Sequence, residues 1–203
     1  KRYPFMKRPV VLLLGKVPPP FMGPAIATKI LLDSSLKDRF RLLHLDTRAH
    51  RSLDKMGRFD LLKVFRTVFI YAKMKWMVIR HRPSVCIIPV SQSTLGFVKD
   101  SLYVLIAKGL FSKAILHLRG SNFRKWYEGA SPLTKWYVRR ILSAVSGVLV
   151  QGERLRPIFQ GLVPVDRIQV VPNGADLPLH PDFRLHRPFK ILYLANLQAS
   201  KGI

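Results

Sequence analysis

A histidine and an arginine stand at the end of a short apolar run, where their side chains could bind a ligand. The run is Lys113 to Leu118, and His117 and Arg119 fall at its carboxyl end, before Gly120-Ser121-Asn122. Residues two apart on a strand point to the same side, so we expect both side chains to face one ligand. The histidine can hold a hydroxyl group or accept a proton near neutral pH, and the arginine can bind phosphate. A buried structural histidine is the alternative interpretation.

A second candidate is the proline-rich loop Lys16 to Pro24, which joins the first apolar run to the first helical pattern. Ligands of open parallel sheets bind at the carboxyl ends of the strands, and a helix N-terminus offers N–H groups to a phosphate. Gly23 would let the backbone approach such a group. The alternative interpretation is that a helix begins at Gly23 and Pro24 and binds no ligand there. This motif alone favours the alternative. Neither a dinucleotide fingerprint nor a P-loop motif occurs in the sequence.

A third candidate consists of two motifs on either side of a proline-rich segment. The first is Val170 to Asp176, which contains Pro172-Asn173-Gly174, and the second is Ile191 to Gly202, which ends in Lys201-Gly202. Each motif alone is common, because Pro-Asn-Gly is an ordinary turn and Lys-Gly often follows a strand. In this order, across a linker, the two motifs together are much more specific.

Short apolar runs alternate with amphipathic stretches along the chain, and this alternation predicts the fold class. Strands are predicted at 10–14, 40–45, 84–90, 113–118, 147–151 and 167–171. Helices are predicted at 24–36, 59–81, 94–111 and 131–146, with a short helix near 155–159. Strands that are apolar throughout and separated by helices are typical of a parallel sheet covered on both faces. We therefore expect a doubly wound, Rossmann-like α/β domain.

The pattern changes after residue 171, which predicts a domain boundary. Residues 178–188 contain three prolines and two histidines and are typical of a linker. Residues 189–194 form another buried strand pattern, and the chain ends shortly after it. We expect one domain over residues 1–177, an interdomain linker over 178–188 and the start of a second domain over 189–203.

These motifs resemble the retaining glycosyltransferases of family four, which have the two-domain GT-B fold. In that family a strand ending in Pro-Asn-Gly-x-Asp closes the N-terminal domain, as Pro172 to Asp176 would here. The next domain opens with a strand and a pattern ending in Lys-Gly, which resembles Ala195 to Gly202. The turn Leu118 to Ser121 and the stretch Val148 to Leu155 also agree with the family, so the resemblance extends over essentially the whole chain.

The resemblance implies transfer of a sugar from a nucleotide-sugar donor to a lipid-linked, glycan or phosphorylated acceptor. It implies retention at the anomeric carbon and neither a cofactor nor an obligatory metal. It further implies that His117 or Arg119 stands where the family carries its catalytic histidine. The residues it implies for the donor and its phosphates are Gly23, Asn173, Gly174 and Lys201. The family's C-terminal domain is absent, so we expect this chain to be a fragment or half of a split enzyme, inactive alone.

The composition joins a strong positive charge to a substantial apolar content. The chain has 203 residues, 35 Lys+Arg against 11 Asp+Glu, a formal net charge of +24 and 48% hydrophobic residues. Disordered chains combine high charge with low hydrophobicity, so simple disorder is excluded. The charge predicts a polyanionic partner: nucleic acid, anionic lipid or a phosphorylated substrate. No apolar run approaches the roughly 20 residues of a spanning helix, and the single Cys86 fits a reducing cytoplasm.

The helical stretch 61–79 bears on the choice of partner. An apolar stripe at spacings of three and four is expected to face the sheet: Leu61, Phe65, Val68, Ala72, Trp76 and Ile79. The adjoining face carries Lys63, Arg66, Lys73 and Arg80, with Ile70 and Met77 among them. Basic and apolar side chains together are typical of a helix that lies on anionic lipid. A solvated basic face beside a buried stripe is the slightly favoured alternative. A second basic region includes Arg124 and Lys125.

Two other function classes explain the charge. A nucleic-acid-binding module explains it directly, but the sequence has no RNP aromatics, zinc spacing or helix-turn-helix pattern, so this class is disfavoured. A non-catalytic half that anchors a partner subunit to a membrane is the other alternative. With the glycosyltransferase interpretation, we expect a cytoplasmic protein that is peripheral at the inner face of the membrane.

Overall fold

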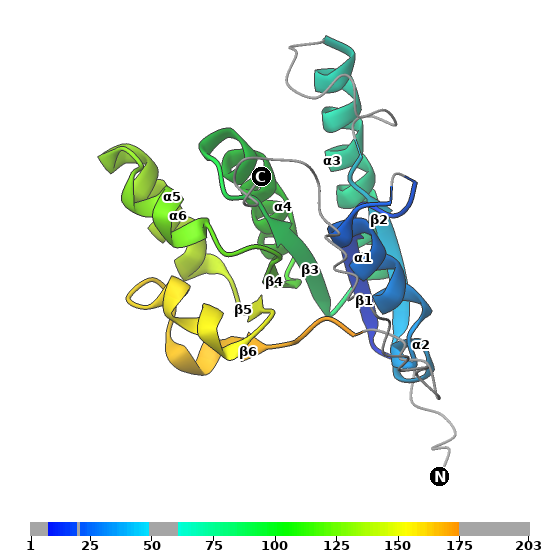
Figure 1. Ribbon diagram of the computed structural model, residues 1–203. Helices are drawn as coiled ribbons and strands as arrows, with labels where there is room; N and C mark the ends of the chain where they lie inside the picture. Colours follow the sequence, from blue (N-terminus) through cyan, green and yellow to red (C-terminus); the bar gives the residue numbers. More distant parts are fainter. Residues whose placement is uncertain (1–7, 20, 49–60, 175–203) are drawn as a thin grey trace, which may run out of the picture.

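A computed structural model describes residues 8–19, 21–48 and 61–174 of the chain, apart from the side chains of 61–63. Within these residues, six strands form one sheet in the order β2-β1-β3-β4-β5-β6, and every neighbouring pair is parallel (Figure 1). The strands are β1 (Val10–Gly15), β2 (Arg41–Asp46), β3 (Val85–Val90), β4 (Lys113–Leu118), β5 (Gly147–Val150) and β6 (Ile168–Val170). The predicted α/β class with a parallel sheet is confirmed.

The connections between these strands are mostly helical. The helices are α1 (Gly23–Asp33), α2 (Leu36–Arg39), α3 (Leu61–His81), α4 (Thr94–Gly109), α5 (Phe123–Glu128), α6 (Pro132–Ala144), and the 3-10 turns η1 (Glu153–Phe159) and η2 (Val165–Arg167). The helix predicted over 24–36 ends at Asp33, where Ser34 turns to an extended conformation and its hydroxyl donates to the Leu31 carbonyl at 2.8 Å. The short helix α5 was not predicted.

The two faces of the sheet differ in how well they are covered. Right-handed crossovers put α1, which leads from β1 to β2, on one face and α3, α4 and α6 on the other. On the α3 and α4 side the strand residues are fully buried, as Cys86, Ile88 and Leu116 illustrate. On the α1 side, Ile87 and Ile115 are half-buried. The main core of the described residues therefore lies between the sheet and α3, α4 and α6.

The strand order changes direction between β1 and β3. From β1 the chain moves to β2 on one side, and from β3 onward every strand is added on the other side. In open parallel sheets, such a reversal separates the loops at the carboxyl ends and leaves a crevice where ligands bind. The loops after β1 and β3, together with the neighbouring loop after β4, therefore define the place to look for a site.

Helix α3 buries a different face from the one predicted. Its buried residues are Ile70, Met74, Met77 and Val78. The expected inner stripe is exposed instead wherever its side chains are described: Phe65, Val68, Ala72, Trp76 and Ile79. Both sets repeat at spacings of three and four, so periodicity alone could not decide which one faces α4 and the sheet.

Candidate functional site

A pocket of about 170 Å³ lies between α1 and the segment that follows β6. It is lined by Gly23, Ile26, Ala27, Ile30, Leu31, His117, Val171, Pro172, Asn173 and Gly174. Four of these were predicted from three distant parts of the sequence, namely Gly23, His117, Asn173 and Gly174. The structure thus brings most of the predicted donor and catalytic residues to one place, while Lys201 lies outside the described residues.

His117 is the most unusual polar residue of this pocket. Its side chain is only 4% exposed, and its Nε2 atom has no hydrogen-bond partner among the described residues. Its Nδ1 atom accepts a long hydrogen bond, 3.5 Å, from Nε of Arg119. A guanidinium group can only donate, so Nδ1 must be the unprotonated nitrogen and Nε2 must carry the proton. His117 therefore lines the pocket and holds a buried N–H donor that has no partner among the described residues.

The protonation state of His117 follows from its surroundings. Burial, and secondly the positive charge of Arg119, lower the pKa of His117 from 6.5 to about 4. The imidazole is therefore neutral at pH 7. Of the two roles predicted for this residue, a hydrogen bond to an oxygen fits better than proton acceptance, because the nitrogen without a partner, Nε2, already holds a proton.

Arg119 joins the end of β4 to helix α1. Its Nη1 atom donates to Thr28 Oγ1 at 2.6 Å and also to the Pro24 carbonyl oxygen. Burial lowers the pKa of Arg119, and no carboxylate in the described part of the chain pairs with it. Burying a cation whose partners are all neutral costs electrostatic free energy. A bound anion, such as a phosphate, would offset this cost.

Gly15 and Thr28 fit together closely under this cluster, and the contact is testable. A Cβ atom at Gly15 would lie 2.8 Å from Thr28 Oγ1, the atom that binds Arg119. We expect Gly15→Ala to lower the free energy of unfolding by about 1–3 kcal/mol, because the added methyl group must displace Thr28. In a urea titration, Gly15→Ala combined with Thr28→Ala should lose less than the sum of the single changes. Additive losses would contradict the contact.

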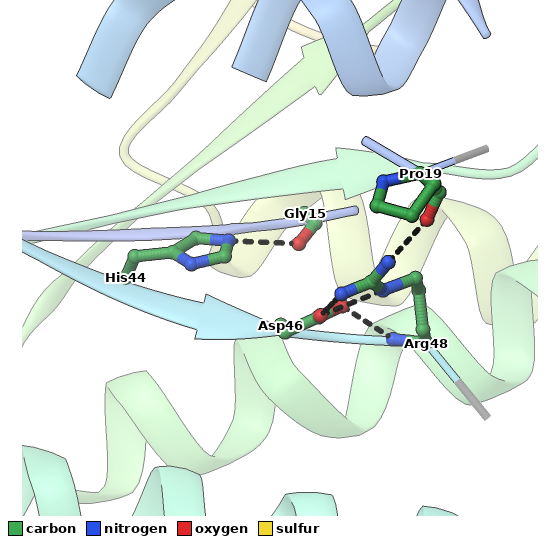
Figure 2. Close-up of polar contacts among 5 residues, drawn as sticks. All are labelled: Gly15, Pro19, His44, Asp46 and Arg48. Atoms are coloured by element: carbon green, nitrogen blue, oxygen red, sulfur yellow. Dashed lines mark hydrogen bonds and ion pairs between the residues drawn. The ribbon is translucent and has the colours of Figure 1, made fainter. Parts of the chain in front are cut away.

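The loop between β1 and α1 is held from the end of β2 (Figure 2). Arg48 donates through its backbone N–H and its Nε to the Asp46 carboxylate, at 3.0 and 2.6 Å. Its Nη1 atom also donates to the Pro19 carbonyl oxygen. His44 lies two residues before Asp46, on the same side of β2. Its Nε2 donates to the Gly15 carbonyl oxygen at 3.0 Å. These contacts fix the start of the loop at Gly15 and its middle at Pro19.

The N-terminus of α1 itself offers few free donors. Pro24 has no N–H group, and the N–H groups of Ala25 and Ile26 already donate to the Met22 carbonyl at 2.8 and 2.9 Å. The backbone N–H of Gly23 is therefore the donor to consider at this end of the helix. A Cβ atom at Gly23 would meet nothing within 4 Å, so the space in front of it is open.

The neighbouring loops support the same edge of the sheet. Gln92, after β3, accepts a hydrogen bond from the Asn122 backbone at 2.5 Å, and a Cβ atom at Gly120 would overlap the Gln92 side chain. Gln151, after β5, donates to the side-chain oxygen of Asn173 at 2.8 Å. Asn173 is thus tied to the sheet, and Gly174 beside it has open space where a side chain would be.

Three residues of this region were missed by the sequence analysis. Thr28 gave no signal, because it is an ordinary helix residue whose partner Arg119 is 91 positions away. Asp46 and Arg48 could have been found, because they stand at the end of β2 with the same spacing of two that singled out His117 and Arg119 at the end of β4. They hold the loop in place and do not line the pocket.

The remaining predicted residues fall on two separate surfaces. Lys63, Arg66, Lys73 and Arg80 belong to α3, and the side chain of Lys63 is not described. Arg124 and Lys125 belong to α5, and α4 lies between α3 and the helices α5 and α6 (Figure 1). Arg124 is already engaged, since it pairs with Glu128 at 2.6 Å and donates to the Gln160 carbonyl at 2.8 Å. The two basic regions therefore do not form one surface.

Two further observations concern the described ranges as a whole. Their His, Cys, Asp and Glu side chains do not gather in groups of three that could hold a metal ion. None of the helices in the same ranges is long and apolar enough to cross a membrane.

No family model matches the sequence. No curated protein matches it either. A solved structure of MurG from Acinetobacter baumannii aligns with 83% of this chain and 47% of its own, at a TM-score of 0.40 and 8% sequence identity. The chain thus spans about half the length of that protein.

Proposed function

We propose that this chain is the N-terminal, acceptor-side part of a GT-B glycosyltransferase of the family-four type. It would transfer a sugar, with retention, from a nucleotide-sugar donor to a membrane-linked or phosphorylated acceptor. In this proposal residues 1–177 form the acceptor-side domain, 178–188 the linker and 189–203 the start of the donor-binding domain. The protein would work at the inner face of the membrane.

One observation carries the proposal. His117 lines a pocket at the carboxyl ends of the strands of a parallel sheet, and its buried, protonated Nε2 has no partner among the described residues. Leaving a buried donor unpaired costs about 1–3 kcal/mol, which is a reason to expect a ligand there. A sugar hydroxyl is an oxygen acceptor of the required kind.

Charge near the pocket supports the same class of ligand. Arg119 lies beside His117 and lacks an acidic partner in the described ranges, so it can offset the negative charge that develops on a leaving diphosphate. Gly23 and Gly174 line the pocket without side chains, which leaves room for the donor to approach the backbone. Lys201 would complete the phosphate site from the second domain, as the motif resemblance implies.

The proposal is tested by sugar transfer in the full-length protein that carries this chain. Labelled nucleotide-sugars, offered one at a time with polyprenyl phosphate in detergent, should give a labelled lipid. We expect His117→Ala to lower the rate roughly tenfold or more, since a hydrogen bond to the sugar is lost. His81→Ala is the matched control, because His81 lies near the amino ends of the strands, away from the pocket. Full turnover of His117→Ala would remove this residue from the mechanism, and no transfer from any donor would reject the class.

A further inference from the structure

Helix α3 carries a row of large apolar side chains that its packing in the domain does not use. Five of them are between 55% and 71% exposed: Phe65, Val68, Phe69, Trp76 and Ile79. At 3.6 residues per turn they lie on the side of the helix away from the buried Ile70 and Met74. Single exposed apolar residues are ordinary, but a contiguous row of this size marks an interaction surface.

Basic side chains border this apolar row. Arg66, Lys73 and Arg80 are seven residues apart, which is two helical turns, so they follow one line along the edge of the row. Lys75 lies on the opposite edge, and the sequence of α3 contains neither aspartate nor glutamate. The helix therefore presents an apolar strip between cationic margins.

Apolar side chains near the start of α3 are exposed. Val64, Phe65, Val68 and Phe69 are all exposed, and among the described side chains of the helix the first buried one is Ile70. Figure 1 shows this end of α3 extending past the rest of the domain beyond β2. A solvated helix end is normally polar, so four apolar residues there indicate that the end enters an apolar environment.

The apolar surface continues from α3 onto α4. A groove of about 500 Å³ between the two helices is lined by Tyr71, Lys75, Leu102, Leu105, Ile106, Gly109 and Leu110. At the other end of α3, Ile79 shares a second hollow with Phe111. Phe111 is 100% exposed and has a left-handed φ of 61°, a conformation that a bulky side chain rarely adopts. The surface thus runs the length of α3 and is broad enough to lie against a flat partner.

We propose that this α3 surface docks the protein on an anionic lipid bilayer. Phe65, Phe69 and Trp76 would enter the interface between headgroups and acyl chains, and Lys73 and Arg80 would contact lipid phosphates. A bilayer offers both an apolar interior and negative charge, which matches an apolar strip with cationic edges. Nucleic acid offers only the charge to such a strip, and a second copy of a chain with a net charge of +24 would be repelled.

The proposal rests on the membrane-linked acceptor of the proposed function, but its test needs no sugar transfer. Purified protein is sedimented with vesicles of phosphatidylcholine alone or of phosphatidylglycerol and phosphatidylcholine in equal parts. We expect binding to the anionic vesicles, little binding to the neutral ones, and weaker binding as salt is raised. Absence of binding to anionic vesicles overturns the docking proposal while leaving the transferase proposal, which is assayed in detergent, unaffected.

Matched variants assign the surface. Trp76→Ser on α3 and Trp136→Ser on α6 remove side chains that are 59% and 62% exposed. We expect Trp76→Ser to weaken vesicle binding roughly tenfold or more, because it removes an aromatic side chain that would be buried in the bilayer. Trp136→Ser should change vesicle binding little. Phe69→Ser should act as Trp76→Ser does. Equal losses for the two tryptophan variants, or a loss confined to Trp136→Ser, would reject α3 as the docking surface.

Tryptophan fluorescence gives a second, direct readout. A variant with Trp126→Phe and Trp136→Phe keeps Trp76 as its only tryptophan, since the chain has three. Its emission should shift to shorter wavelength with anionic vesicles and be quenched by brominated lipid. An unshifted Trp76 in a sample that sediments with vesicles would show that another surface binds. Duplex RNA gives the opposite test. If RNA abolishes vesicle binding and the Trp76 emission is unchanged in the RNA complex, nucleic acid is favoured as the partner instead of the bilayer.

Discussion

Between pH 7 and pH 5 the ligand-free chain is expected to lose about 2 kcal/mol of unfolding free energy through His117 alone. Burial and Arg119 lower the pKa of this residue in the folded chain to about 4, against an ordinary value of 6.5. At a pH between these two values the unfolded chain binds a proton at His117 and the folded chain does not. Falling pH therefore favours unfolding, and this contribution to stability is fully present only above about pH 6.5.

Urea titrations at the two pH values measure this loss. His117→Leu keeps an apolar group in the site and cannot bind a proton, so its loss between pH 7 and pH 5 should be smaller by about 2 kcal/mol. Taking the difference cancels the other titrating groups that the two proteins share. Equal acid losses in the two proteins would mean that His117 is not held neutral. Because His117→Leu also removes the Nε2 donor, the variant would gain acid stability while losing the proposed ligand contact.

Removal of the Phe123 side chain should have the largest effect on stability, about 3–5 kcal/mol for Phe123→Ala. The ring is fully buried and packs against Phe97, Trp126 and Phe159, with ring centroids 6.1, 5.2 and 4.9 Å away. Its removal would leave a cavity shared by α4, α5 and η1. These elements support the turn that follows Arg119, so we also expect the pocket edge at β4 to loosen.

The chain provides a control of the same residue type. Phe111 is 100% exposed, and alanine would have to adopt the same left-handed backbone conformation. Phe111→Ala should therefore change the free energy of unfolding by no more than about 0.5 kcal/mol. Chemical denaturation of both variants at pH 7 compares the two. Similar losses for Phe123→Ala and Phe111→Ala would contradict the packing of the α4, α5 and η1 core.

Most of the sheet could be predicted because its strands are apolar runs with clear limits. The strand predicted at 113–118 has these same bounds in β4, where Ser112 precedes it and the polar Arg119 and Gly120 follow. The strand predicted at 10–14 is one residue longer, and that at 84–90 begins one residue later. Apolar strands that alternate with helices are expected to pair in parallel. The short right-handed connections between them then allow few strand orders.

The orientation of α3 could not be predicted from the same rules. Its sequence has two apolar faces, so Phe65, Val68 and Trp76 form a stripe as regular as that of Ile70, Met74 and Met77. The buried side chains are the ones that fit against α4 and the sheet, and that fit depends on residues far away in the sequence. The domain buries only one of the two apolar faces of α3, so the other face is left as a surface for another partner.

The candidate site was predictable in part. The period of two along a strand predicted that His117 and Arg119 would face one side, and their side chains do contact each other at 3.5 Å. The pocket also contains Gly23 and Asn173, which were chosen from turn and motif patterns. The neutral state of His117 and the role of Thr28 depend on burial and on contacts between β4 and α1, and no local sequence pattern encodes these.

The strand order also has a consequence for how the chain folds during its synthesis. After β1 and β2 have paired, β3 joins the free edge of β1, and β4, β5 and β6 each join the strand made just before them. Every new strand therefore meets a finished edge, and none must be inserted between strands that are already paired. Because synthesis releases the strands in chain order, each strand can pair as soon as it emerges. The growing edge stays unpaired only until the next crossover is complete, while β2 remains the strand at the other edge throughout.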